Sequence, residues 1–488
     1  MTHPSAVHPS HMAMHRDRRW LALVLLCLGE LMIVLDTTIV NVALPSIKTD
    51  LHFGDTALAW VVNAYMLTYG GFLLLGGRLG DLYGHRRLFL LGIAGFTLTS
   101  LACGLSSTQS ALVIARSVQG LGGAVVSAAA LSLIMDLFTE PGDRAKAMGV
   151  FGFVCAGGGS LGAMLGGLLT SSLSWHWVFL VNLPIGAAVV VAAWCWVPKA
   201  PPTATSRHLD VFGAVTVTTA LMLAVYAIIN GSQSGWDSAR TLGQLGVAIA
   251  LLLLFVWIET RVQVPLMPLR LFKLRNLAVA NAAGVLWAAA MFAWFFLSAL
   301  YMQLVLGYGP MQVGLAFLPA NLIMAAFSLG LSARLVMRFG IRRPLAVGLA
   351  LAACGLLCFA QASEHGRFIS VILPGMLLLG VGAGVAFNPI LLAAMSDVGP
   401  SESGLASGVV NTSFMMGGSL GLAVLATLAE ARTQSVWTAG VSHAALLAAG
   451  YRWAFFAGAC FAALGAVLSA TLLRTPAAPA QEQAITVH

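Results

Sequence analysis

Long apolar runs, separated by short polar links, repeat along the whole chain. Each run is about 20 residues long, which is the length that a helix needs to cross the hydrocarbon core of a bilayer. The runs alternate weakly between apolar and polar positions, so they do not favour a transmembrane β-barrel. The pattern predicts fourteen spanning helices, near residues 20–42, 58–78, 88–105, 109–135, 147–171, 176–197, 211–230, 241–261, 277–304, 313–335, 345–362, 368–394, 404–430 and 451–473.

One polar link occurs twice. The first copy is Gly77–Arg87, and a degenerate copy occupies residues 333–343. The shared positions are Arg78, Leu79, Gly84, Arg86 and Arg87, which match Arg334, Leu335, Gly340, Arg342 and Arg343. A weaker echo joins Gln119–Gly122 to Leu379–Gly382. A link repeated this far apart predicts a molecule built from two related halves, as in many secondary transporters.

The register of the repeat sets the domain plan. Spans one to six correspond to spans nine to fourteen, and spans seven and eight become an inserted pair. We therefore expect a six-helix bundle over 20–197, a linker with two extra helices over 198–276, and a second six-helix bundle over 277–474. Residues 1–19 and 475–488 are expected to be cytoplasmic tails.

Composition supports lipid as the solvent of this chain. It is 59% hydrophobic and 9% charged, far below the charge of a typical soluble domain. The basic residues predict the orientation, because cytoplasmic loops of membrane proteins carry an excess of Lys and Arg. With both termini in the cytoplasm, the 25 Lys and Arg lie on the cytoplasmic side except for Lys48, Arg116, Arg240, Arg367, Arg432 and Arg452. The net charge of +8 is thus explained by topology in an inner membrane, without a nucleic-acid partner.

No cofactor is expected. The seven cysteines fit no bridge framework, and the eleven histidines lie in tails, links or helix ends, which argues against a haem or an intramembrane metal site. The sequence contains no cluster of a nucleophile and a base that would indicate an enzyme. It also contains no phosphate-binding P-loop, so ATP is not expected to be the energy source.

Three charged residues lie deep in predicted spans. Asp36 and Glu30 lie in the first span, where a carboxylate costs about 2.5–3.5 kcal/mol on insertion scales and so marks a functional position. At 100° per residue, the two lie about 120° apart around the helix. Arg116 in span four needs a partner, and either carboxylate is a candidate. We expect these three residues to couple a proton or cation to transport, the alternatives being a permanent structural salt bridge and a packing role for Asp36.

The repeated link has its own mechanics. Gly77 and Gly84 are expected to permit a tight turn. Asp81 can pair with Arg86 or Arg87, or face a helix N-terminus in the other half. In the second copy Met337 replaces this acid, so its role is expected to be mainly topological.

Several motifs together make the chain resemble the major facilitator superfamily, and within it the fourteen-spanner drug:proton antiporters of the QacA/EmrB type. They are Leu35–Pro45 in span one, Arg116–Gly122 in span four, Trp177–Pro184 in span six and Gly404–Asn411 in span thirteen. The resemblance implies an all-α membrane fold of two six-helix bundles plus an inserted pair. It also implies that the Gly77–Arg87 link acts as a cytoplasmic latch.

Span five resembles the antiporter motif of that family, at the interface between halves. Its residues are Gly158, Gly162, Gly166 and Gly167, and the first three are spaced by four, as in close helix packing. Ala163 replaces the expected proline, so close packing alone is an equal alternative. Candidates for a substrate cavity are Asn41, Gln119, Asn411 and Trp287.

The sequence therefore predicts a monomeric exporter that exchanges protons for lipophilic, cationic small molecules across the bilayer. Export of a natural product, amino acid or siderophore is the nearest alternative. Uptake by symport and an integral-membrane enzyme are more distant ones.

Overall fold

The structure, a computed structural model, describes residues 16–54, 57–198, 210–263, 265–398, 403–436 and 442–474. Within these ranges the regular elements are helices, and no strand occurs. A first group of helices consists of α1 (Arg16–Leu51), α2 (Trp60–Tyr83), α3 (His85–Gly104), α4 (Gln109–Leu137), α5 (Pro141–Ser172), α6 (Trp177–Leu180) and α7 (Asn182–Trp196). A second group consists of α10 (Arg275–Leu300), α11 (Pro310–Ala326), α12 (Ser332–Phe339), α13 (Arg342–Phe359), α14 (Leu373–Met395), α15 (Ser403–Ser435) and α16 (His443–Leu472).

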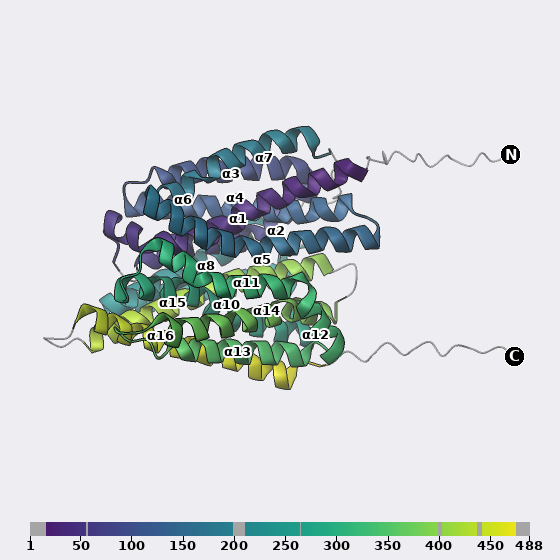
Figure 1. Ribbon diagram of the computed structural model, residues 1–488. Coiled ribbons are helices and arrows are strands. Elements are labelled where there is room, and N and C mark those ends of the chain that lie inside the picture. Colours follow the sequence, from purple (N-terminus) through teal and green to yellow (C-terminus); the bar gives the residue numbers. More distant parts are fainter. Residues whose placement is uncertain are drawn as a thin grey trace, which may run out of the picture.

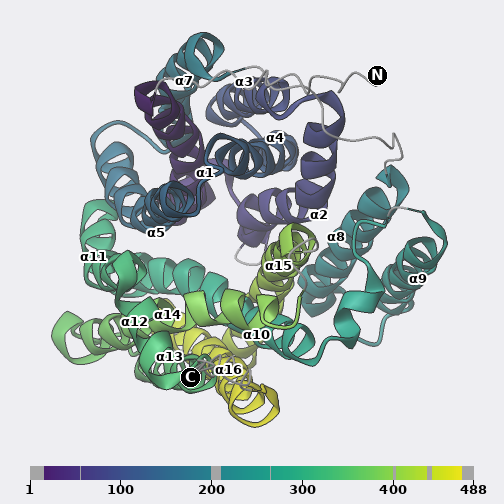
Figure 2. The same cartoon turned by 90° about the vertical axis from the view of Figure 1, so that its right-hand side faces the viewer.

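The two groups lie side by side as separate bundles (Figure 1). Two seams join them, one where α5 meets α11 and one where α2 meets α15 (Figure 2). The remaining helices, α8 (Val211–Ser234) and α9 (Ala239–Arg261), pack on each other at the edge of the molecule. Of these two, α8 contacts α2 and α15, so the inserted pair lies beside the second seam.

Helices cover each of the fourteen predicted ranges, but twelve in the described part of the chain are long and apolar enough to be candidate spans. The count of fourteen is thus not supported. The two predicted spans that are not among these twelve correspond to shorter apolar helices. These helices are Leu161–Ser172, within α5, and Pro310–Ala326. The second is cut short by a π-helical segment, Phe327–Leu331, in which Gly330 has a φ of 124° and breaks the helix before α12.

Polar and glycine contacts fasten the halves at several levels. The Ser419 hydroxyl on α15 donates to Asn63 Oδ1 on α2 at 2.8 Å, and both residues are fully buried. Nearer the other end of α2, the Leu74 side chain lies against Gly408 of α15. On the first seam, a Cβ at Gly167 would lie 2.9 Å from the Cα of Met311. The halves therefore touch near both ends of the bundle.

Candidate functional site

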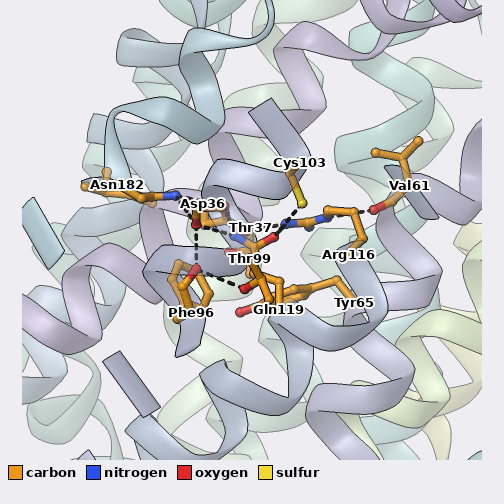
Figure 3. Close-up of polar contacts among 12 residues, drawn as sticks. Asp36, Thr37, Val61, Tyr65, Phe96, Thr99, Cys103, Arg116, Gln119 and Asn182 are labelled. Atoms are coloured by element: carbon orange, nitrogen blue, oxygen red, sulfur yellow. Dashed lines mark hydrogen bonds and ion pairs between the residues drawn. The ribbon is translucent and has the colours of Figure 1, made fainter. Parts of the chain in front are cut away.

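An ion pair lies in the interior of the first bundle. Asp36 on α1 and Arg116 on α4 are 0% and 1% exposed. Arg116 Nη1 donates to Asp36 Oδ2 and, at 2.7 Å, to Gln119 Oε1 (Figure 3). Its Nε donates to the Val61 carbonyl of α2 at 3.0 Å. The structure thus pairs Arg116 with Asp36 rather than with Glu30.

Neutral side chains complete the coordination of the carboxylate. Gln119 Nε2 and Asn182 Nδ2 donate to Asp36 Oδ1 at 2.9 and 3.1 Å. The same two amides reach the hydroxyl of Ser100 on α3, at 2.8 and 3.3 Å. Asn182 is the first residue of α7, directly after the break at Val181 that separates it from α6. Side chains of four helices therefore form one hydrogen-bonded network around the carboxylate, and the site depends on the relative positions of these helices.

Aromatic rings cover the arginine. The Arg116 guanidinium carbon lies 4.4 Å from the centre of the Tyr65 ring and 5.6 Å from that of Phe179. Cation–π contacts of this kind strengthen when water is excluded. Removing one member of a buried ion pair costs about 3–5 kcal/mol, because the other charge is left unpaired. Each member of the pair therefore neutralises the buried charge of the other.

Glu30 forms a separate buried feature. It is 6% exposed, and its Oε2 has no hydrogen-bond partner. Among the described residues, the hydrogen bonds of Asp36 and Arg116 do not include Glu30. A buried acceptor without a donor is costly, so Glu30 is a candidate to bind a proton or a cationic group.

The link at Gly77–Arg87 differs from its prediction. The turn depends on Gly84, which has a φ of 91°. A Cβ at Gly77 would find only Ala128 at 3.9 Å, so this glycine is not required for the turn or for close approach. Asp81 pairs with Arg78 at 3.5 Å and His85 at 3.3 Å, not with Arg86 or Arg87.

Arg86 and its repeat partner Arg342 share one role. Arg86 donates to the carbonyl of Trp194, two residues before the end of α7. Arg342 donates to the carbonyl of Ala470, two residues before the end of α16. Each arginine thus satisfies carbonyls at the end of the last helix of its own half. In the second copy, Met337 is 80% exposed where the first copy has Asp81, and Arg87 is also exposed.

The glycine motif of α5 faces α1 more than it faces the other half. Gly158, Gly162 and Gly166 pack against Val34, Thr38 and Ile39 of α1. Only Gly167 of the four meets the second bundle, at Pro310 and Met311. Nearby, a Cβ at Gly314 of α11 would lie 2.6 Å from the carbonyl oxygen of Ala163. The position without the expected proline therefore lies directly on the seam.

The four candidate cavity residues do not form one wall. Gln119 belongs to the ion-pair network, and Trp287 is 0% exposed within the second bundle. Asn41 is 8% exposed and donates to the Thr37 carbonyl of its own helix. Asn411 is half-buried on α15. Within the described ranges, no group of three or more His, Cys, Asp or Glu could hold a metal ion.

Sequence reasoning missed Ser100, Asn182 and Tyr65. Uncharged polar residues are common in membrane spans, so nothing in the sequence distinguished Ser100. The only signal for Asn182 was its place in the motif Trp177–Pro184.

Two helical bundles with twelve candidate spans among the described residues define a multi-pass membrane protein. The family model of the Major Facilitator Superfamily matches residues 26–422, and the chain belongs to this family. It is 38% identical to a puromycin resistance protein of Streptomyces alboniger over 85% of this chain and 83% of that protein. It is 39% identical to a cephamycin export protein of Amycolatopsis lactamdurans, covering 86% and 87%.

A third relative is the multidrug resistance protein Stp of Mycobacterium tuberculosis, 38% identical over 84% of this chain and 76% of that protein. Among solved structures, an inward-facing bacterial homologue of the human lysosomal transporter Spinster superposes with a TM-score of 0.66. It covers 93% of this chain and 97% of that one at 16% identity, which supports the fold alone.

Proposed function

We propose that this chain is a proton-coupled efflux transporter of the cytoplasmic membrane, which exports lipophilic, cationic compounds. The names of three relatives, which concern resistance or export, support export over uptake. The buried Asp36–Arg116 pair is the observation that carries proton coupling, because it places one protonatable group in a membrane-embedded, water-excluded network.

The exchange proceeds through two states of the pair. In one, Asp36 is ionised and holds α1, α3, α4 and α7 together through Arg116, Gln119 and Asn182. In the other, a proton has neutralised Asp36 and weakened that convergence. Asp36 is enclosed here, so the proton reaches it in another arrangement of the halves. A proton entering along the membrane potential gains about 2.3 kcal/mol per 100 mV, which drives the export.

Glu30 supplies the preference for cations. Its unpartnered oxygen lies on the same helix as Asp36, and a cationic substrate competes with a proton for it. We further propose that α5 and α11–α12 also cross the membrane, since α5 packs along α1 and α11 along α14. This gives fourteen spans with both termini in the cytoplasm.

The test replaces Asp36 with Asn, which has nearly the same size and keeps an acceptor oxygen toward Arg116 while removing the charge. Efflux against a concentration gradient is measured in inverted vesicles with an imposed pH gradient. We expect uphill efflux to be abolished, while downhill movement of the same compound persists. Asp50→Asn is the matched control, since Asp50 lies on the same helix but near its outer end, bonded to Trp175.

Undiminished uphill efflux by Asp36→Asn would refute the coupling role. Loss of both modes together with a lower unfolding temperature would instead identify Asp36–Arg116 as a structural salt bridge.

Export of a natural product is a second candidate, favoured by the cephamycin export protein among the relatives. Growth protection against puromycin and cephamycin, compared with a panel of lipophilic dye cations and repeated with a protonophore, separates the two. Protection confined to one antibiotic favours the natural product, and broad protection against the cations favours multidrug export.

A further inference from the structure

Two acidic residues meet at one end of the inserted helix pair, far along the chain from Asp36. Asp210 directly precedes α8, and Glu259 lies near the end of α9. They are 4% and 5% exposed. One oxygen of each carboxyl is satisfied by backbone, because Asp210 Oδ1 accepts from Gly213 N at 2.8 Å and Glu259 Oε2 accepts from Met267 N at 3.0 Å.

The second oxygen of each carboxyl has no donor. Asp210 Oδ2 and Glu259 Oε1 are buried and without a hydrogen-bond partner, although the two side chains interact with each other. Two carboxylates in contact repel, and both cannot stay ionised in a site shielded from water. A single proton removes this repulsion. A protonated carboxyl donates its O–H to the neighbouring carboxylate, so that Asp210 Oδ2 and Glu259 Oε1 both gain a hydrogen-bond partner.

Among the described residues, the cations near this site have other partners. Arg261, two residues after Glu259, stacks on Trp257 at 5.6 Å, and Arg78 at the end of α2 pairs with Asp81. The other groups that face Glu259 are backbone groups of Leu266 and Met267, from the segment that leads toward α10. In the described residues, no recorded ion pair includes Asp210 or Glu259.

We propose that Asp210 and Glu259 form a second proton-binding site, in which one proton is shared between the two carboxyl groups. The shared proton joins the start of α8 to the end of α9. The place matters, because Leu266 and Ala214 pack there with Leu75 of α2. Proton binding thus secures the linking segment and the inserted pair against the second seam.

Loss of that proton has a definite consequence. At alkaline pH two buried carboxylates face each other and their repulsion loosens α8, α9 and the segment around Leu266. The stabilisation is therefore present at acidic pH and disappears as the pH rises and the proton leaves.

The test uses the purified full chain in detergent with a chelator present, and follows its thermal unfolding midpoint from acidic to alkaline pH. We expect the wild type to lose several degrees over this range. Glu259→Gln supplies a permanent N–H donor to Asp210 and should remove most of that loss. Asp210→Asn should act in the same way, and serves as the second variant if Glu259→Gln does not fold. Asp237→Asn, an exposed position at the opposite end of the same helix pair, is the matched control and should behave as the wild type.

Infrared spectroscopy gives an independent readout. The spectrum of the wild type minus that of Glu259→Gln, or minus that of Asp210→Asn, should contain a protonated-carboxyl band, and bands from Asp36 or Glu30 cancel in these differences. The wild type minus Asp237→Asn should lack the band. The proposal is overturned if both site differences lack the band, or if the pH dependence of both site variants equals that of the wild type. A fall in wild-type stability on chelation at neutral pH would identify a metal ion in place of the proton and would equally overturn it. None of these outcomes depends on Asp36, so the proposed transport function is tested separately.

Discussion

The carboxylate of Asp36 depends on neutral donors as well as on Arg116. Three side chains donate to it, and two of them, Gln119 and Asn182, are uncharged amides that also share the Ser100 hydroxyl. Hydrogen bonds to a charged group in a water-excluded site favour its charged form. The contribution of these amides can be tested separately from that of the ion pair.

Asn182→Leu tests that role, since leucine fills a similar volume without donating. We expect a loss of about 1–3 kcal/mol of stability, because Asp36 and Ser100 each lose a partner. With the ionised form less favoured, the pH profile of efflux should move toward higher pH. Asn230→Leu on α8, where the amide bonds only to the Tyr226 carbonyl, is the control. A lower stability with an unmoved pH profile would show that Asn182 only packs.

At the scale of single residues, the sequence predicted the charged members of the site and not the neutral ones. Asp36 and Arg116 are conspicuous because a charge within an apolar run is costly. Asn182 reaches Asp36 because α7 packs against α1, and a hydropathy pattern does not reveal which helices pack together. Trp287 shows that residue type alone can also mislead. A tryptophan suits a cavity wall, but this one is fully buried within the second bundle on α10.

The element scale is where the repeat is most plainly visible. Gly84 between α2 and α3 and Gly340 between α12 and α13 both have positive φ, 91° and 75°. Each donates its N–H to the carbonyl four residues earlier at 2.8 Å, from Gly84 to Gly80 and from Gly340 to Val336. The glycine survives in both copies while the acid does not, because the turn geometry needs the first and not the second.

Gly84→Ala and Gly340→Ala should therefore destabilise the protein by similar amounts. A side chain in this backbone region costs about 1–3 kcal/mol, seen as a lower unfolding temperature for each variant. Gly95→Ala is the control, because Gly95 lies within α3 with open space around it and alanine favours helix there by up to about 1 kcal/mol. Equal unfolding temperatures for all three variants would show that neither turn needs glycine, and a clear difference between Gly84→Ala and Gly340→Ala would contradict the equivalence of the two turns.

Hydropathy predicted where helices lie but not where they break. All fourteen ranges coincide with helical segments, since length and polarity decide burial in lipid. The break at Gly330 depends on the backbone of a single residue, with a φ of 124°, which leaves the apolar pattern unchanged.

For the whole molecule, the repeat predicted two halves but not how they meet. The seams depend on which helix faces carry residues small enough for close packing. Gly167 packs against Met311 in this way, and Gly408 packs against Leu74. Contacts near both ends of the bundle join the halves in this structure, and the proposed transport function would require each set to open in turn.

Locking one of these contacts should stop transport without unfolding the protein. Asn63 and Ser419 are suited to this, because their side chains meet at 2.8 Å across the second seam. Both are replaced by cysteine in a background in which the exposed Cys195, Cys354 and Cys460 are serine. Oxidation in vesicles should abolish efflux, and a reductant should restore it. The reason is that a disulfide holds α2 against α15 even when a proton gradient is present to drive transport. Asn63→Cys alone should stay active under the same oxidant. Wild-type efflux by the fully cross-linked protein would mean that this seam stays closed throughout the cycle, and that only the α5–α11 seam opens.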